Sequence, residues 1–142
     1  MFDNRDMNLH VALGAALLLP FVLGASVPPP VTITLNPQFG SLERGSATIT
    51  TQGANLVVDI RVTGFPHDAP MQLAHLHRGP CDRLVLAEAI GLNPLLNGRS
   101  HTVLRRADAE RVSVNGAYYV SVHKMLANRS SHVACGGPIR QL

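Results

Sequence analysis

The sequence predicts an all-β protein, a Greek-key antiparallel β-sandwich or barrel. Segments rich in Val, Ile, Thr and Leu alternate apolar and polar residues with a period of two, as strands with one buried face do. Asn, Pro and Gly residues that favour turns separate these segments at short intervals, which is typical of sandwiches and barrels. The chain has 142 residues, enough for one domain with a sizeable core, and helix is expected only in short turns.

The N-terminal segment has the features of an export signal. A short polar start containing Arg5 precedes the apolar run Val11–Leu23, and small residues up to Ser26 offer a cleavage site. The apolar run is shorter than the about 20 residues that span a membrane, although an uncleaved anchor is an open alternative. We therefore expect a signal peptide over residues 1–26 and an exported domain over 27–142 (periplasmic, secreted or at the cell surface), with no membrane segment in the mature form.

Three strands are expected in the first half of the domain. Val31–Leu35 alternates and is rich in β-branched residues, and Ser46–Thr51 repeats this pattern. The turn Gly53-Ala54-Asn55 then leads into Leu56–Val62, in which every second residue is apolar. These patterns predict a hairpin from Ser46 to Val62.

The second half continues the pattern with interruptions. Strands are expected over Gln72–His77, Ser100–Leu104 and Ala117–His123. Leu84–Ile90 fits either a strand or a short helix, because short apolar runs do not distinguish the two. A helical turn is expected over Asp108–Arg111.

His75 and His77 are the residues around which a site is expected. In a strand, residues i and i+2 point to the same face, so the two imidazoles should lie side by side. Ala74 and Leu76 would then point to the opposite face, towards the core.

His123 ends the last predicted strand in the same manner. Val120 and Val122 share the face assigned to the core, and Tyr119, Ser121 and His123 share the other face. A third imidazole from a second strand would complete a site for copper or zinc on the outside of a barrel.

The chain contains two cysteines, Cys81 and Cys135. In an exported protein an even pair favours a disulfide, because the compartment is oxidising. Two free buried thiols are the alternative.

These residues together resemble the copper/zinc superoxide dismutases. The resemblance covers the chain from about Val31 to Gln141 and rests on four motifs in the same order: His75-Leu76-His77, Cys81, Val122-His123-Lys124 and Val133-Ala134-Cys135-Gly136. It implies one copper ion bound by His75, His77 and His123, and an intrachain disulfide between the two cysteines. Ala74–Pro80 and Gly116–His123 also resemble the CHRD-type β domains, which are not established enzymes.

The chain departs from the dismutase pattern at two places. Between Cys81 and Tyr118 the only histidine is His101, so the zinc ligands and the bridging histidine of that family are missing and zinc is not expected. The family carries an arginine three residues before the second cysteine, which guides superoxide to copper. His132 stands at that place and is the candidate catalytic residue.

Two functions from different classes remain after this comparison. The first is a copper-dependent enzyme that acts on superoxide or another small redox molecule. The second is a non-catalytic exported domain that buffers copper or serves as an interaction module. Nucleic-acid binding is not expected, because the basic residues behind the net charge of +3 are scattered and aromatic residues make up only 4% of the chain.

Overall fold

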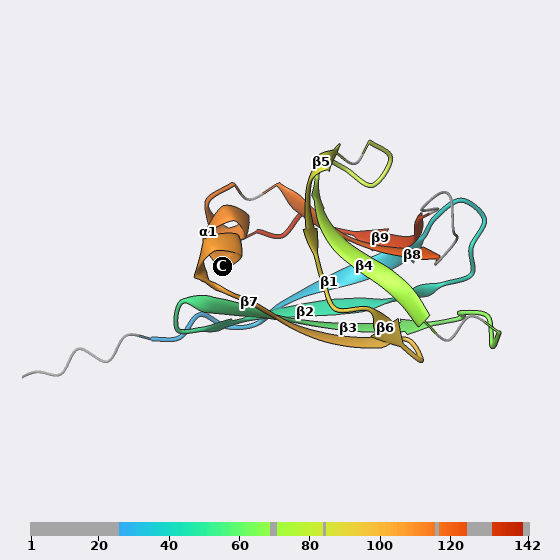
Figure 1. Cartoon of the computed structure of the whole chain (residues 1–142), viewed down its shortest axis with the longest axis horizontal. Helices are drawn as coiled ribbons and strands as arrows, with labels where there is room; N and C mark the ends of the chain where they lie inside the picture. Colours follow the sequence, from blue (N-terminus) through green and yellow to red (C-terminus); the bar gives the residue numbers. More distant parts are fainter. Residues whose placement is uncertain (1–25, 69–70, 84, 116, 125–131, 141–142) are drawn as a thin grey trace, which may run out of the picture.

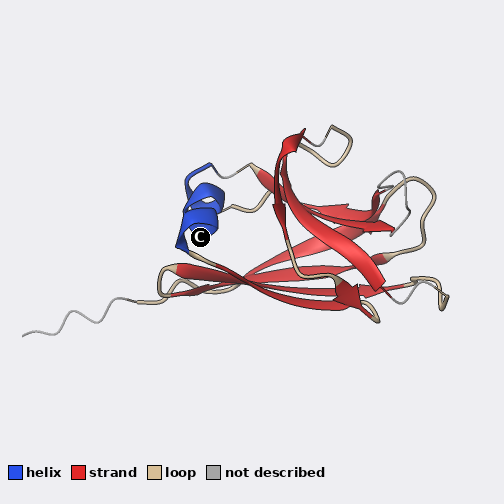
Figure 2. Ribbon diagram, in the orientation of Figure 1, coloured by secondary structure: helices blue, strands red, loops and turns tan. Residues whose placement is uncertain are grey.

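A computed structural model of the chain describes residues 26–68, 71–83, 85–115, 117–124 and 132–140. The predicted signal peptide lies outside these ranges, apart from Ser26. The all-β prediction is confirmed within them, as Figure 2 shows at a glance. The elements are β1 (Val31–Pro37), β2 (Arg44–Gln52), β3 (Asn55–Thr63), β4 (Met71–Arg78), β5 (Val85–Gly91), β6 (Leu95–Leu96), β7 (Arg99–Leu104), α1 (Arg106–Asn115), β8 (Tyr118–Lys124) and β9 (His132–Gly136).

The strands form one antiparallel sheet that closes on itself as a barrel. Their order is β5-β4-β6-β7-β3-β2-β1-β9-β8, and β4 also pairs with β8, which joins the two ends. β5 is an additional strand that pairs with β4 beyond the point where β6 joins it. In Figure 1, β2, β3 and β7 run together along one side, β8 and β9 lie on the other, and α1 packs at one end. The particular likeness to superoxide dismutases stays a prediction.

The predicted hairpin is confirmed as β2 and β3. The two strands pair from Arg44 opposite Thr63 to Gln52 opposite Asn55, which leaves Gly53 and Ala54 as a two-residue turn. Gly53 has a φ of +58°, which glycine adopts without strain and which tight hairpin turns require.

The barrel interior is filled by the apolar residues of alternating strand positions. Leu76, Val120 and Val122 are fully buried in it, and Ala74 is almost fully buried, so the faces assigned to the core in β4 and β8 are confirmed. The cluster comprises Ile33, Leu35, Ala47, Ile49, Leu56, Val58, Ile60, Val62, Ala74, Leu76, Ile90, Leu95, Leu104, Ala109, Val112, Tyr118, Val120, Val122, Val133, Ala134 and Ile139.

Three elements differ from the sequence prediction or go beyond it. The segment that fitted strand or helix is the strand β5, because it pairs with β4. The helical turn expected over Asp108–Arg111 is part of the ten-residue helix α1, so helix is not confined to short turns. Ala109 and Val112, one turn apart, enter the core and stabilise this longer helix. β9 was not expected at all.

A buried polar pair fixes the β1–β2 connection against β4. Glu43 and Gln72 are both 1% exposed, and the Gln72 Nε2 donates a hydrogen bond of 2.6 Å to Glu43 Oε2. Gln72 precedes His75 by three residues. The pair therefore holds the loop after β1 close to the strand that carries two of the predicted metal ligands.

Cys81 and Cys135 form the expected disulfide. It connects the segment that leaves β4 with β9, and β9 in turn pairs with β8. The bond therefore ties together the strands that carry His77, His123 and His132. Within the described ranges, no helix is long and apolar enough to cross a membrane.

Removal of this disulfide should destabilise the fold. A Cys81→Ser/Cys135→Ser double variant should lose about 2–5 kcal/mol of unfolding free energy, because the bond closes a long loop in the unfolded chain. Urea unfolding followed by circular dichroism measures this loss. Wild-type protein with a reducing agent should show the same loss, and an unchanged midpoint in both samples would contradict the prediction.

Candidate metal centre

The pairing of β4 with β8 brings the three predicted ligands to one face. His75 lies opposite Ser121, and His123 lies opposite Leu73, so His75 and His123 are diagonal neighbours across the two strands. His77 lies two residues beyond His75 on the same strand and therefore points to the same face. The shared face that the sequence predicted is thus observed.

The three imidazoles are close enough to share one ion. Their ring centroids are 5.5 Å (His75 to His77), 5.0 Å (His75 to His123) and 5.5 Å (His77 to His123) apart. One ligand nitrogen from each ring lies within 4.8 Å of the other two. The three histidines could therefore bind a metal ion.

The spacing of two nitrogens suits a metal directly. The Nε2 atoms of His77 and His123 are 3.4 Å apart. With an ion about 2.0–2.1 Å from each nitrogen, the nitrogen–metal–nitrogen angle would be roughly 110°, close to the tetrahedral value. Copper and zinc are both commonly bound by imidazole, so the geometry alone does not identify the ion.

Burial of the site is greater than the sequence suggested. The prediction placed the imidazoles on the outside of the barrel, yet His77 is 2% and His123 1% exposed, and only His75 is partly open. His132 of β9 covers them, with ring centroids 4.2 Å from His123 and 5.8 Å from His77. Phe39 of the β1–β2 loop approaches His132 in turn, at 6.5 Å.

His132 lies beside the three-histidine group and is linked to it by a serine. The Ser121 hydroxyl is within hydrogen-bond distance of His123 Nε2 (3.0 Å) and of His132 Nδ1. A hydroxyl has one proton, so it can donate to one ring and must accept an N–H from the other. The sequence prediction missed Ser121 as part of the site, although it lies on the same face of β8 as His123.

Burial favours the uncharged form of His75, His123 and His132. It lowers the pKa of His75, and burial together with repulsion between protonated His75 and His132 lowers the pKa of His132. For His123, burial followed by the charges of His132, His75 and His77 lowers the pKa to about 3. Neutral imidazole is the form that binds a metal, so protons compete little at neutral pH.

Two ring nitrogens at the site have unmet bonding capacity. Among the described residues, His75 Nδ1 and His123 Nδ1 are buried and make no hydrogen bond. A buried polar atom without a partner costs about 1–3 kcal/mol, so structures seldom keep one without a reason. A metal bound through His75 Nδ1 would satisfy that atom, whereas the Nδ1 of His123 would stay unpartnered if its Nε2 faces the ion.

Two further histidines of the described residues lie outside the site. His101 is exposed on β7, where its Nδ1 lies 2.7 Å from Asp59 Oδ1, and His67 is exposed in the loop after β3.

Comparisons with protein-family models, with characterised proteins and with solved structures find no match to this chain. The assignment of the site therefore rests on its own geometry.

The lowered pKa values predict how stability depends on pH in the metal-free protein. Between pH 6.5 and about 3, the unfolded chain binds a proton at His123 that the folded chain does not bind, and the lowered pKa values of His75 and His132 act in the same direction, so stability should fall as the pH falls. Each histidine contributes a slope of at most about 1.4 kcal/mol per pH unit. Urea unfolding with a chelator present, repeated from pH 7 to 4, measures the decline.

A matched pair of variants isolates the contribution of His123. His123→Gln should flatten the decline, because it removes the residue with the largest shift. His67→Gln removes an exposed histidine and should leave the decline unchanged. Equal pH profiles for His123→Gln and wild type would contradict the prediction.

Proposed function

We propose that this chain is an exported domain that binds one copper ion through His75, His77 and His123 and reacts with superoxide there. The observation that supports a metal most strongly is the convergence of three imidazoles, with two Nε2 atoms 3.4 Å apart. Copper is favoured over zinc because nitrogen sites generally bind cupric ion more tightly. The order of the histidine and cysteine motifs, which resembles the copper/zinc superoxide dismutases, supports the same choice.

Export is supported by the disulfide. Disulfides persist in oxidising compartments and are rare in the cytosol, so the Cys81–Cys135 bond suggests an oxidising compartment. A mature domain that starts near residue 27 would carry the whole three-histidine site. Superoxide, or another small redox molecule, is the proposed partner.

The roles of the protein groups follow from their positions. The three histidines would hold the ion, and bound copper would supply one-electron chemistry by alternating between its cupric and cuprous states. Dismutation consumes two superoxide ions and two protons and gives O₂ and H₂O₂. His132, which covers the ligands from β9, would border the approach to the ion.

One observation favours the second candidate, a copper-buffering domain without turnover. His132 stands where the dismutase family carries a guiding arginine, and burial lowers its pKa, so it is uncharged at neutral pH. An uncharged group attracts the superoxide anion weakly, because steering depends on positive charge near the site. We therefore expect slower dismutation than in proteins that have both the arginine and the zinc site.

Electron paramagnetic resonance of the copper-loaded protein tests the ligand set. The nitrogen hyperfine structure should report three imidazoles, and His123→Ala should change it and weaken copper binding by more than about 100-fold. The loss of a ligand should exceed the loss of an outer-shell partner of a ligand, which already costs about 10–100-fold. His101→Ala is the matched control and should leave both signal and affinity unchanged. A signal insensitive to His123→Ala would refute the three-histidine site.

A superoxide assay on the copper-loaded protein then separates the two candidates. A dismutation rate above that of free copper at equal concentration supports the enzyme, provided that His123→Ala loses this excess rate. Tight copper binding without such activity supports the buffering domain. The copper content of protein purified without added metal shows whether the protein carries copper before reconstitution.

A further inference from the structure

The outer face of β3 and β7 carries a second group of charged side chains, away from the histidines of β4 and β8. The strand register sets Asp59 opposite His101 and Arg61 opposite Arg99. These four residues border an open depression of about 400 Å³, to which Leu96 adds an exposed apolar side chain.

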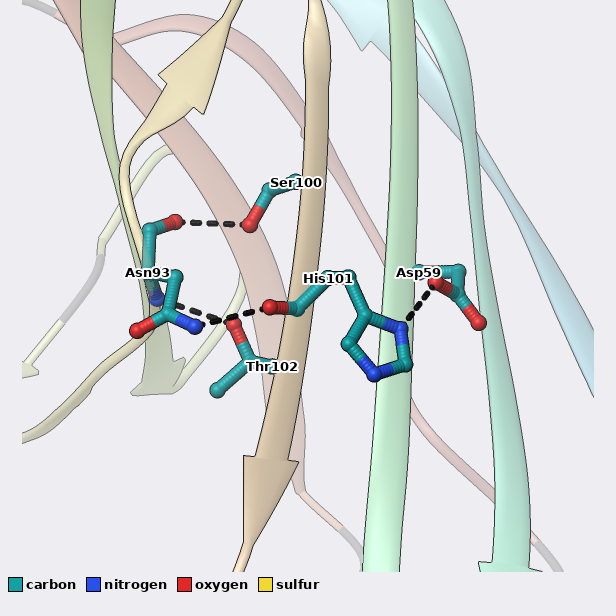
Figure 3. Close-up of polar contacts among 5 residues, drawn as sticks. All are labelled: Asp59, Asn93, Ser100, His101 and Thr102. Carbon is teal, nitrogen blue, oxygen red and sulfur yellow. Dashed lines mark hydrogen bonds and ion pairs between the residues drawn. The ribbon is translucent and has the colours of Figure 1, made fainter.

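Asn93 hydrogen-bonds to three successive residues of β7, as Figure 3 shows. Its backbone N–H donates to the Thr102 hydroxyl (2.8 Å) and its side-chain amide donates to the His101 carbonyl (2.7 Å). The Ser100 hydroxyl donates to the Asn93 carbonyl (2.7 Å). Three successive residues of β7 are therefore held by Asn93 on one side of the strand, while the His101 ring points to Asp59 on the other side (Figure 3).

The two arginines of this face are not paired with its carboxylate. Asp59 is occupied by His101, whose Nδ1 lies 2.7 Å from its Oδ1. Within the described part of the chain, neither Arg61 nor Arg99 has a carboxylate partner. Like charges directly opposite each other on neighbouring strands are destabilising, so this arginine pair costs stability in the free protein.

We propose that Arg61 and Arg99 bind a tetrahedral oxyanion, the phosphate or sulfate group of an ester. Guanidinium groups match such oxygens with forked pairs of N–H donors, and an anion between the two would remove their mutual repulsion. Ser46 lies opposite Arg61 on β2 and adds a hydroxyl to the same row of the sheet. Leu96 offers apolar contact to the organic part of the ester.

Isothermal titration of the metal-free protein with inorganic phosphate, methyl phosphate and methyl sulfate tests this site. We expect a Kd on the order of 1 mM, so that about 10 mM ligand nearly fills it. Arg61→Gln and Arg99→Gln should each weaken binding about tenfold, and Arg61→Lys should fall between wild type and Arg61→Gln because it keeps the charge without the fork. The stronger of the two esters identifies phosphate or sulfate as the group recognised.

Arg105→Gln is the matched control, because Arg105 is an exposed arginine outside the depression. It removes the same charge and should leave the affinity unchanged. No saturable binding of any of the three anions, or an equal loss in Arg105→Gln and Arg61→Gln, would overturn the proposal. Circular dichroism of each variant confirms that the fold is retained. Copper is absent from the titration, so its outcome is independent of the three-histidine site.

Discussion

The antiparallel pairing of β4 with β8 is the interaction on which both the core and the candidate metal centre depend. On one face of the pair, Leu76 and Val122 enter the barrel interior, and on the other face His75, His77 and His123 converge. A shift of one residue would exchange the faces and bury imidazoles in the apolar core. Burial of the core residues therefore fixes the register, and the register fixes the spacing of the histidines.

This coupling explains why much of the arrangement could be predicted from sequence. Strand alternation is a local property, and it assigns His75 and His77 to one face without any knowledge of the fold. The hairpin of β2 and β3 is predictable for the same reason, since Gly53 supplies the turn that its two strands need. The disulfide could be predicted because an exported chain with two cysteines has only one possible pairing.

What the sequence did not predict depends on contacts between distant segments. β9 has only five residues, and Val133, Ala134 and Cys135 are all buried, so it shows no alternation from which a strand could be recognised. Its register with β8 also shifts between Val122 and His123, an irregularity that brings His132 opposite His123. The cover over the site and its link through Ser121 both follow from that shift, which no local pattern indicates.

The burial of these histidines is itself an argument that they serve a purpose other than folding. Folding alone favours apolar side chains at buried positions, because an imidazole nitrogen buried without a hydrogen bond costs about 1–3 kcal/mol. His75 Nδ1 and His123 Nδ1 are two such atoms among the described residues, and the pKa of His123 is lowered to about 3 by the same burial. A metal bound through His75 Nδ1 would give that atom a partner and recover part of this cost, whereas His123 faces His77 through Nε2 and would keep its Nδ1 unpartnered. The same burial also keeps His123 in the neutral form that binds a metal, so a cost to folding becomes an advantage for metal binding.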